Sequence, residues 1–265
     1  MSRVLVTNDD GIDAPGLRRL AAAAVARGHD VVVAAPDEEA SGSSAALTAT
    51  QEKGRVVVHP RPLAGLPGVK GFAVASSPGF IALIAEHGAF GDPPEIVLSG
   101  INRGANAGRA VLHSGTVGAT LTAAASGLRA LAVSLDILTP GGLSAAVGTA
   151  LAGEDDRNWV TAADLAGQLL DTLVGLPPAT VLNLNVPDVP AEKVRGVRRA
   201  ALATFGQVQM TIAEIGEGYI RTAIEETAVD LIPGTDLALL ADGYATVTPL
   251  MAVGEAPLRL PEPYR

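Results

Sequence analysis

The sequence predicts an α/β protein with a Rossmann-like, doubly wound, mostly parallel sheet and a C-terminal β-hairpin extension. Two observations support this fold class. Over the first 190 residues, short apolar runs without alternation, which are typical of strands covered on both faces, alternate with segments of helical periodicity. Beyond residue 197 the apolar pattern changes to period two, which indicates antiparallel strands with one exposed face.

The individual elements follow from these patterns. Residues 3–6 form an apolar strand, and the helix after it begins with Pro15 and is stopped by Gly28. Residues 31–35 form a second strand, which Pro36 ends. Further strand candidates are residues 56–58, 72–75, 96–98, 131–135 and 180–186. Further helix candidates are residues 78–89, 117–126 and 159–173. This alternation predicts parallel strands connected by crossover helices.

The domain organisation is predicted from the change in pattern. Residues 1–190 are expected to form the α/β core that carries the metal site, and residues 191–265 a C-terminal portion that closes back on this core. Within the C-terminal portion, residues 208–212 and 219–224 flank Gly216-Glu217-Gly218 as a long hairpin. This hairpin is either an oligomerisation arm or an extra edge hairpin of the same domain.

Composition and charge limit the function classes. The 265 residues are 48% hydrophobic, which is enough for a substantial buried core. The absence of cysteine excludes disulfides, thiolate metal sites and a cysteine nucleophile. A net charge of −9 argues against a nucleic-acid polymer or a membrane as partner. The sequence shows no signal-peptide pattern and no apolar run of about 18 residues, so we expect a cytoplasmic location.

Polar residues gather in three loops that follow predicted strands. These loops are residues 7–15, 36–48 and 99–116, and they are rich in Asp, Asn, Ser and Gly. In an open parallel sheet, ligands bind in the crevice beyond the carboxyl ends of the strands. The three loops therefore predict one shared site.

The first of these loops contains the adjacent acids Asp9 and Asp10, which repel each other and indicate a bound cation. Ser41 offers a hydroxyl, and Asn102 and Asn106 offer amide oxygens. Oxygen ligands of this kind suit Mg²⁺, Mn²⁺ or Ca²⁺ better than zinc. Taken alone, the loops around the acids and around Ser41 could also be an ordinary strand-ending turn and a flexible loop.

A phosphate site is predicted beside the metal. Ser114, Gly115 and Thr116 precede a predicted helix, where amides and hydroxyls attract anions. A metal next to a bound phosphate is an arrangement for phosphoester hydrolysis. The chain lacks the Gly-x-x-x-x-Gly-Lys-Ser/Thr motif of nucleoside triphosphate enzymes and the Gly-x-Ser-x-Gly motif of α/β-hydrolases.

These motifs together resemble the SurE-type survival proteins, which are metal-dependent 5'/3'-nucleotidases with broad acid phosphatase activity. The motifs keep their order along almost the whole chain. They are Thr7-Asn8-Asp9-Asp10-Gly11-Ile12-Asp13-Ala14-Pro15-Gly16, Ala35-Pro36-Asp37 with Ser41-Gly42, Ser99-Gly100-Ile101-Asn102-Arg103-Gly104-Ala105-Asn106, Ser114-Gly115-Thr116-Val117, Leu184-Asn185-Val186-Pro187, Gly234-Thr235-Asp236, Gly243-Tyr244 and Thr248-Pro249-Leu250.

The resemblance implies a metal held by Asp9, Asp10, Ser41 and Asn102, with Mg²⁺ or Mn²⁺ as the ion. It also implies a Rossmann-like core, a C-terminal hairpin that exchanges contacts between subunits, and a homodimer or homotetramer. Nucleoside monophosphates are the usual substrates of the family.

Several positions depart from the family pattern. Ala45-Ala46 stands where a His or Asn followed by Ser is usual, and Phe80 replaces an acidic residue. Arg109 brings positive charge close to the predicted phosphate site, and His113 stands where tyrosine is common. The four metal positions are intact while their surroundings differ. The expected substrate is thus a nucleoside monophosphate or a related phosphorylated small metabolite.

Further site residues are assigned by role. Asp9 and Asp10 count as catalytic residues together with His113, which as a general acid could protonate the leaving alkoxide. The alternative for His113 is a helix cap or a packing residue. Asn8, Asn106 and Arg109 are assigned to the phosphate, with a solvated loop arginine as the alternative for Arg109.

The sequence therefore predicts a phosphomonoesterase that uses metal-activated water. The alternative is a homologue that keeps the metal and binds a phosphorylated ligand without turnover.

Overall fold

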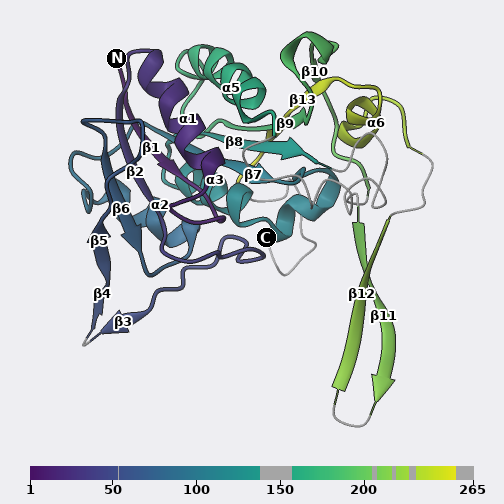
Figure 1. Ribbon diagram of the computed structural model, residues 1–265, viewed down its shortest axis with the longest axis horizontal. Helices are drawn as coiled ribbons and strands as arrows, with labels where there is room; N and C mark the ends of the chain where they lie inside the picture. The colour runs from purple at the N-terminus through teal and green to yellow at the C-terminus, as the bar shows by residue number, and fades with distance from the viewer. Residues whose placement is uncertain (53, 138–156, 205–207, 217–218, 227–230, 255–265) are drawn as a thin grey trace, which may run out of the picture.

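The computed structural model describes residues 1–52, 54–137, 157–204, 208–216, 219–226 and 231–254. Its centre is a nine-stranded sheet, in which the strands from β9 to β6 run parallel (Figure 1). In spatial order the strands are β10 (Val197–Arg199), β13 (Ala245–Leu250), β9 (Val181–Pro187), β8 (Arg129–Asp136), β7 (Ile96–Arg103), β1 (Arg3–Thr7), β2 (Asp30–Pro36), β6 (Lys70–Val74) and β5 (Val58–Pro60). The predicted fold class is confirmed.

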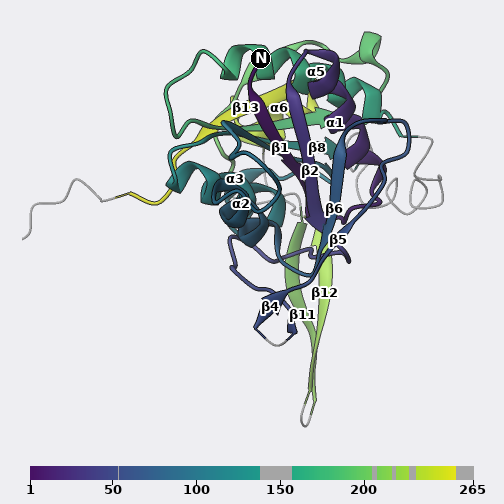
Figure 2. The ribbon, with the colours of Figure 1, turned by 90° about the vertical axis from the view of Figure 1, so that its left-hand side faces the viewer.

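The helices cover both faces of the sheet. They are α1 (Pro15–Ala26), α2 (Pro78–Glu86), α3 (Gly115–Ala125), α5 (Trp159–Leu173) and α6 (Asp236–Ala241), with short 3-10 helices η1 (Gly108–His113) and η3 (Ala191–Lys193). Figure 2 shows α2 and α3 on one side of the sheet and α1 on the other. None of the helices in the described ranges combines the length and apolar character needed to cross a membrane.

Alternation along β1 explains the two-sided core. Val4 and Val6 pack in the cluster formed with α1 and α5, whereas Leu5 points to the opposite face and packs with α2 and α3. All three side chains are 0% exposed. Full burial of such a side chain contributes about 1.5–3 kcal/mol. An unalternated apolar run is therefore the pattern that a strand covered on both faces requires.

The strand order creates a crevice beside β1. From β1 the chain proceeds outward through β2 and β6, then crosses to the other side of β1 and continues through β7, β8 and β9. The loops that leave β1 and β7 therefore diverge, which opens the space where ligands of doubly wound folds bind. Of the predicted metal residues, Asp9 and Asp10 follow β1, Ser41 follows β2, and Asn102 lies near the carboxyl end of β7.

The C-terminal portion contributes to the same sheet. β13 pairs antiparallel with β9 and parallel with β10, and β5 is the antiparallel strand at the opposite edge. Sequence patterns predicted neither antiparallel edge. The sheet thus continues past the boundary proposed at residue 190, and the division into two domains stays a prediction.

A two-stranded hairpin projects away from the body in both views (Figures 1 and 2). It consists of β11 (Val208–Gly216) and β12 (Tyr219–Glu226), which in the described part of the chain pair only with each other. A separate small hairpin joins β3 (Gln51–Glu52) and β4 (Arg55–Val56). Tyr219 and Ile220 are 53% and 62% exposed. A role of the longer hairpin in oligomerisation stays a prediction.

Three predicted segments fall outside the described residues. They are Glu217-Gly218 of the hairpin turn, residues 139–156, which the sequence predicts to be a loop or weak helix, and the final residues 255–265.

Candidate metal centre and phosphate site

The turn after β1 is built by Asn8. Its side-chain amide donates to the carbonyl of Gly11 at 3.0 Å, and its side-chain oxygen accepts from the Gly11 amide at 3.2 Å. Gly11 has φ +99°, a conformation that glycine adopts without a steric penalty. Asn8 is 0% exposed and lines none of the described cavities. Its side chain shapes the turn that presents Asp9 and Asp10. The phosphate role assigned to Asn8 stays a prediction.

Asp9 lies against the N-terminus of α3. The Thr116 hydroxyl donates to Asp9 Oδ1, and the Thr116 amide also stabilises this carboxylate. Asp9 is only 4% exposed, and burial raises its pKa above the ordinary value although the Thr116 hydrogen bonds oppose the shift. The first turn of α3 thus holds the Asp9 carboxylate. A phosphate at this helix terminus stays a prediction.

Asp10 has an unsatisfied oxygen. Its Oδ2 atom is buried and has no hydrogen-bond partner among the described residues. Burial, together with the negative charges of Asp9 and Glu39, raises the pKa of Asp10 to about 7 against the opposing effect of Arg103. A buried carboxylate oxygen without a partner is costly, and a cation is the natural partner for it.

Asn102 follows an irregularity in β7. The register with β8 shifts between Ser99 and Asn102, and Gly100 has φ +137°. A Cβ at Gly100 would lie 2.2 Å from the Val133 carbonyl oxygen, so only glycine fits there. The Asn102 amide group donates to the Gly104 carbonyl at 2.8 Å. This bond orients the side chain so that its oxygen remains available as a ligand.

Ser41 belongs to the loop after β2. The Ala40 amide donates to the Asp9 carbonyl at 2.8 Å, which fastens this loop to the turn after β1. The Ser41 hydroxyl donates to Glu39 Oε1 at 2.6 Å. Glu39 is absent from the predicted site because a glutamate in a loop belongs to no recognisable sequence pattern.

A cavity of about 270 Å³ brings the predicted metal residues together. It is lined by Asp9, Asp10, Glu39, Ser41, Gly42, Asn102, Arg103, Asn106, Ala110, His113 and Ser114. All four predicted metal residues are present, together with Asn106, Ser114 and His113 from the predicted phosphate and catalytic sets. The oxygen-rich donors fit a hard divalent cation.

The four predicted metal residues include two neutral side chains, Ser41 and Asn102. No group of three or more His, Asp or Glu side chains within the described ranges could hold a metal ion by itself. A metal at the predicted position would therefore combine the two carboxylates with the neutral oxygens of Ser41 and Asn102.

Besides Asn8, three predicted phosphate residues lie outside the lining of the metal cavity. Thr116 is fully buried, and its hydroxyl is used by Asp9. Gly115 is also buried; a methyl group there would approach Ser43 Oγ to 2.6 Å and Asp9 Oδ2 to 2.8 Å. Arg109 is exposed and lines none of the described cavities. The arginine that lines the metal cavity is Arg103.

Asn106 is held by a buried polar network. Its backbone N–H donates to Asn185 Oδ1 at 2.8 Å, and its side-chain amide donates to Ser134 Oγ at 2.9 Å. The Asn106 carbonyl accepts from Asn183 at 2.8 Å and from Asn185 at 3.0 Å. Asn185 belongs to the motif Leu184-Asn185-Val186-Pro187, one of those that resemble the SurE pattern. In the structure this motif holds the backbone of Asn106 in place.

A second distant contact holds the same loop. Asp236 is fully buried, and its two oxygens accept from the backbone amides of Gly108 at 2.7 Å and Ala203 at 2.9 Å. The motif at residues 234–236 therefore positions the segment that carries Asn106 and His113.

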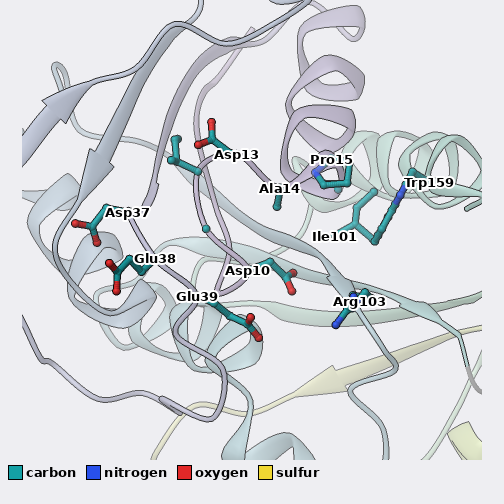
Figure 3. A pocket seen from close by; sticks show the side chains of 13 residues that line it. Asp10, Asp13, Ala14, Pro15, Asp37, Glu38, Glu39, Ile101, Arg103 and Trp159 are labelled. Atoms are coloured by element: carbon teal, nitrogen blue, oxygen red, sulfur yellow. The ribbon is translucent and has the colours of Figure 1, made fainter. Parts of the chain in front are cut away.

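A neighbouring cavity of about 340 Å³ shares Asp10, Glu39 and Arg103 with the metal cavity (Figure 3). Trp159, the single tryptophan of the chain, lines its far side together with Ile101. This space adjoins the cavity that contains the predicted metal residues.

Comparison with known proteins decides the family. The sequence profile of the family described as "Survival protein SurE" matches residues 4–209. The chain belongs to the SurE family. It is 36% identical over 253 residues to a 5'-nucleotidase SurE of Nitratidesulfovibrio vulgaris, covering 94% of this chain and 92% of the relative. It is 35% identical over 255 residues to a 5'-nucleotidase SurE of Pseudomonas putida, covering 94% and 91%.

The fold comparison agrees with the SurE assignment. The crystal structure of the SurE protein from Aquifex aeolicus superimposes with a TM-score of 0.71 at 25% sequence identity. The superposition covers 94% of this chain and 93% of that SurE chain.

Proposed function

We propose that this SurE-family protein is a divalent-metal-dependent phosphomonoesterase that hydrolyses a nucleoside monophosphate or a related phosphorylated small metabolite. The observation that carries the proposal is the buried, unpartnered Oδ2 of Asp10 in a cavity that also holds Asp9, Ser41 and Asn102. The names of the relatives, 5'-nucleotidases, support the substrate class.

The cation would be held by Asp9, Asp10, Ser41 and Asn102, and Mg²⁺ or Mn²⁺ suits these oxygen donors. When bound, the ion supplies activation of water and polarisation of a phosphoryl oxygen. The Thr116 hydroxyl keeps the Asp9 carboxylate in place by donating a hydrogen bond to Oδ1.

The phosphate would contact side chains on the remaining wall of the cavity. Arg103 supplies positive charge there, and Ser114 and Asn106 supply hydrogen-bonding groups. The Ser114 oxygen accepts from the Val117 amide at 3.1 Å and caps α3, which leaves its proton available for donation. These residues orient the ester in the cavity.

His113 is the candidate proton donor. Its exposed imidazole lines the metal cavity next to Ser114. A protonated imidazole at this position can donate a proton to the oxygen of the leaving alcohol.

Phosphate release tests the proposal. Purified protein is assayed with p-nitrophenyl phosphate, nucleoside monophosphates, sugar phosphates and other phosphorylated metabolites, with Mn²⁺ or Mg²⁺ and with chelator. Release should require the cation, and Asp9→Asn should reduce it by several orders of magnitude. Asp92→Asn, an exposed aspartate after α2, is the matched control. Full activity in chelator would refute metal dependence, and binding without release would establish a non-hydrolytic ligand-binding protein.

Two further predictions belong to this proposal. A homodimer or homotetramer that uses the β11–β12 hairpin, and a cytoplasmic location, are expected for a protein with this function. Size-exclusion chromatography with light scattering measures the oligomeric state directly.

A further inference from the structure

Glu39 stands where three cavities meet. It lines the metal cavity, the adjoining 340 Å³ cavity and a third cavity of about 530 Å³ between the loop after β2 and the end of β6. Figure 3 shows the Glu39 side chain extending toward Asp10 and Arg103, whereas Asp37 and Glu38 extend to the opposite side. Of three consecutive acidic residues, only Glu39 is therefore directed at the metal centre.

The contact of Glu39 within the centre is with Ser41. The Ser41 hydroxyl donates to Glu39 Oε1 at 2.6 Å, which is a short, charge-assisted hydrogen bond. A serine hydroxyl has one proton and two lone pairs. When the proton is directed to Glu39, the lone pairs are directed elsewhere and can serve a cation. A carboxylate acceptor also increases the electron density on the hydroxyl oxygen.

Direct ligation by Glu39 fits the structure less well. Asp9, Asp10 and Glu39 all line the cavity, yet they do not form a three-carboxylate group able to hold a metal within the described residues. Glu39 is also exposed, so its charge alone would be screened by solvent. An effect through Ser41 depends on hydrogen-bond geometry and is not lost in this way.

We infer that Glu39 is a positioning residue of the metal centre, which fixes the Ser41 hydroxyl so that its oxygen faces the cation. The inference rests on the proposed metal-dependent function. In metalloproteins, loss of such a partner to a ligand weakens metal binding by roughly 10–100-fold.

A double-mutant cycle on metal-free protein tests this role. Mn²⁺ is titrated calorimetrically into wild type, Glu39→Ala, Ser41→Ala and the double variant. Each single substitution should weaken Mn²⁺ binding by roughly 10–100-fold. The double variant should bind no more weakly than Ser41→Ala, because Glu39 acts only through that hydroxyl. Equal losses from Glu39→Ala with and without Ser41 would overturn the inference.

A second set of variants separates the effect of the Glu39 charge from the effect of its hydrogen bond to Ser41. Glu39→Gln keeps a carbonyl oxygen that can accept the Ser41 proton, and it should weaken binding no more than Glu38→Gln, which removes the same charge one residue away. A loss with Glu39→Gln as large as with Glu39→Ala would show that charge, not orientation, is responsible. Circular dichroism and thermal unfolding of the metal-free variants should match wild type.

The experiment separates the two proposals. Absence of Mn²⁺ binding by wild type would refute the metal-dependent function and the role of Glu39 together. Tight binding by wild type with additive effects in the cycle would refute the role of Glu39 alone.

Discussion

The Thr116 hydroxyl donates a hydrogen bond to Asp9 Oδ1 across 107 residues of sequence. It joins the turn after β1 to the first turn of α3, and both groups are buried. The bond orients the carboxylate and favours its ionised form, against the burial that raises its pKa.

Thr116→Val removes this hydrogen bond with little change in shape. A hydrogen bond to a charged group contributes about 1.5–3 kcal/mol, so phosphate release at saturating Mn²⁺ should fall roughly 10–100-fold. Thr116→Ser keeps the hydroxyl and should retain most of the activity. Similar rates for wild type and Thr116→Val would show that the bond is not needed to orient Asp9.

Asp10 should make the stability of the metal-free protein depend on pH. Its folded pKa, about 7, exceeds the ordinary value of 3.8. The folded protein therefore binds a proton that the unfolded chain has lost, and stability falls as pH rises between these two values. Asp10→Asn should be more stable than wild type at pH 8 by an amount on the order of a few kcal/mol, and similar to wild type near pH 4.

Denaturant unfolding in chelator at a series of pH values measures this difference, with Asp92→Asn as an exposed control. Adding Mn²⁺ at pH 8 should stabilise wild type far more than Asp10→Asn. A gap between wild type and Asp10→Asn that does not change with pH would contradict the prediction.

Gly115→Ala should impair the site although alanine normally favours a helix by up to about 1 kcal/mol. The added methyl group would lie 2.6 Å from Ser43 Oγ and 2.8 Å from Asp9 Oδ2, so Asp9 must move. We expect phosphate release to fall at least about tenfold, as for loss of an oriented charged group. Gly175→Ala is the control, because its nearest neighbour, the Thr172 carbonyl oxygen, is 3.6 Å away. Equal effects of the two substitutions would argue against the close contact.

The roles of Arg103 and Arg109 in phosphate binding can be distinguished by substituting each of them with methionine. Arg103→Met should raise KM for p-nitrophenyl phosphate by about tenfold or more, because a charge-assisted contact to phosphate is lost. Arg109→Met should leave KM near the wild-type value, since Arg109 lies outside the cavity lining. A larger effect at Arg109 would restore the phosphate-clamp role that its sequence position suggests.

The general position of the site could be predicted from sequence because it depends on backbone topology. Apolar strands identify the carboxyl edge of the sheet. Asp9 and Ser41 lie in loops that follow the parallel strands β1 and β2, and Asn102 lies near the end of the parallel strand β7. The cavity that contains these residues is consistent with that reasoning. The location of the site can therefore be predicted from the spacing of the motifs without knowing the directions of the side chains.

Side-chain directions account for what sequence reasoning missed. Asn8 and Thr116 are polar residues within the predicted motifs, yet both are fully buried and bind protein groups. Glu39 and Arg103 line the cavity, whereas Arg109 does not. Whether a loop side chain points into the cavity depends on the backbone conformation of that loop. Hydrophobic periodicity contains no information about this conformation.

The hairpin strands β11 and β12 match the prediction, whereas β13 has no counterpart in it, for a different reason. β13 pairs with β9 across more than 50 intervening residues, and it is antiparallel to an otherwise parallel region. Local propensity identifies a strand but does not specify its partner when the connection is long.

The hydrogen bond from the Gly108 amide to Asp236 spans 128 residues of sequence and has a consequence for how the protein folds. Contacts between distant residues form late, because a long loop must close before they contribute stability. During synthesis, the first strand and both aspartates of the metal centre leave the ribosome early, whereas the loop with Asn106 and His113 must wait for Asp236. A nascent chain can therefore pair its strands from β1 to β9 before Asp236 holds the segment with Asn106 and His113, so the candidate site is completed only near the end of translation.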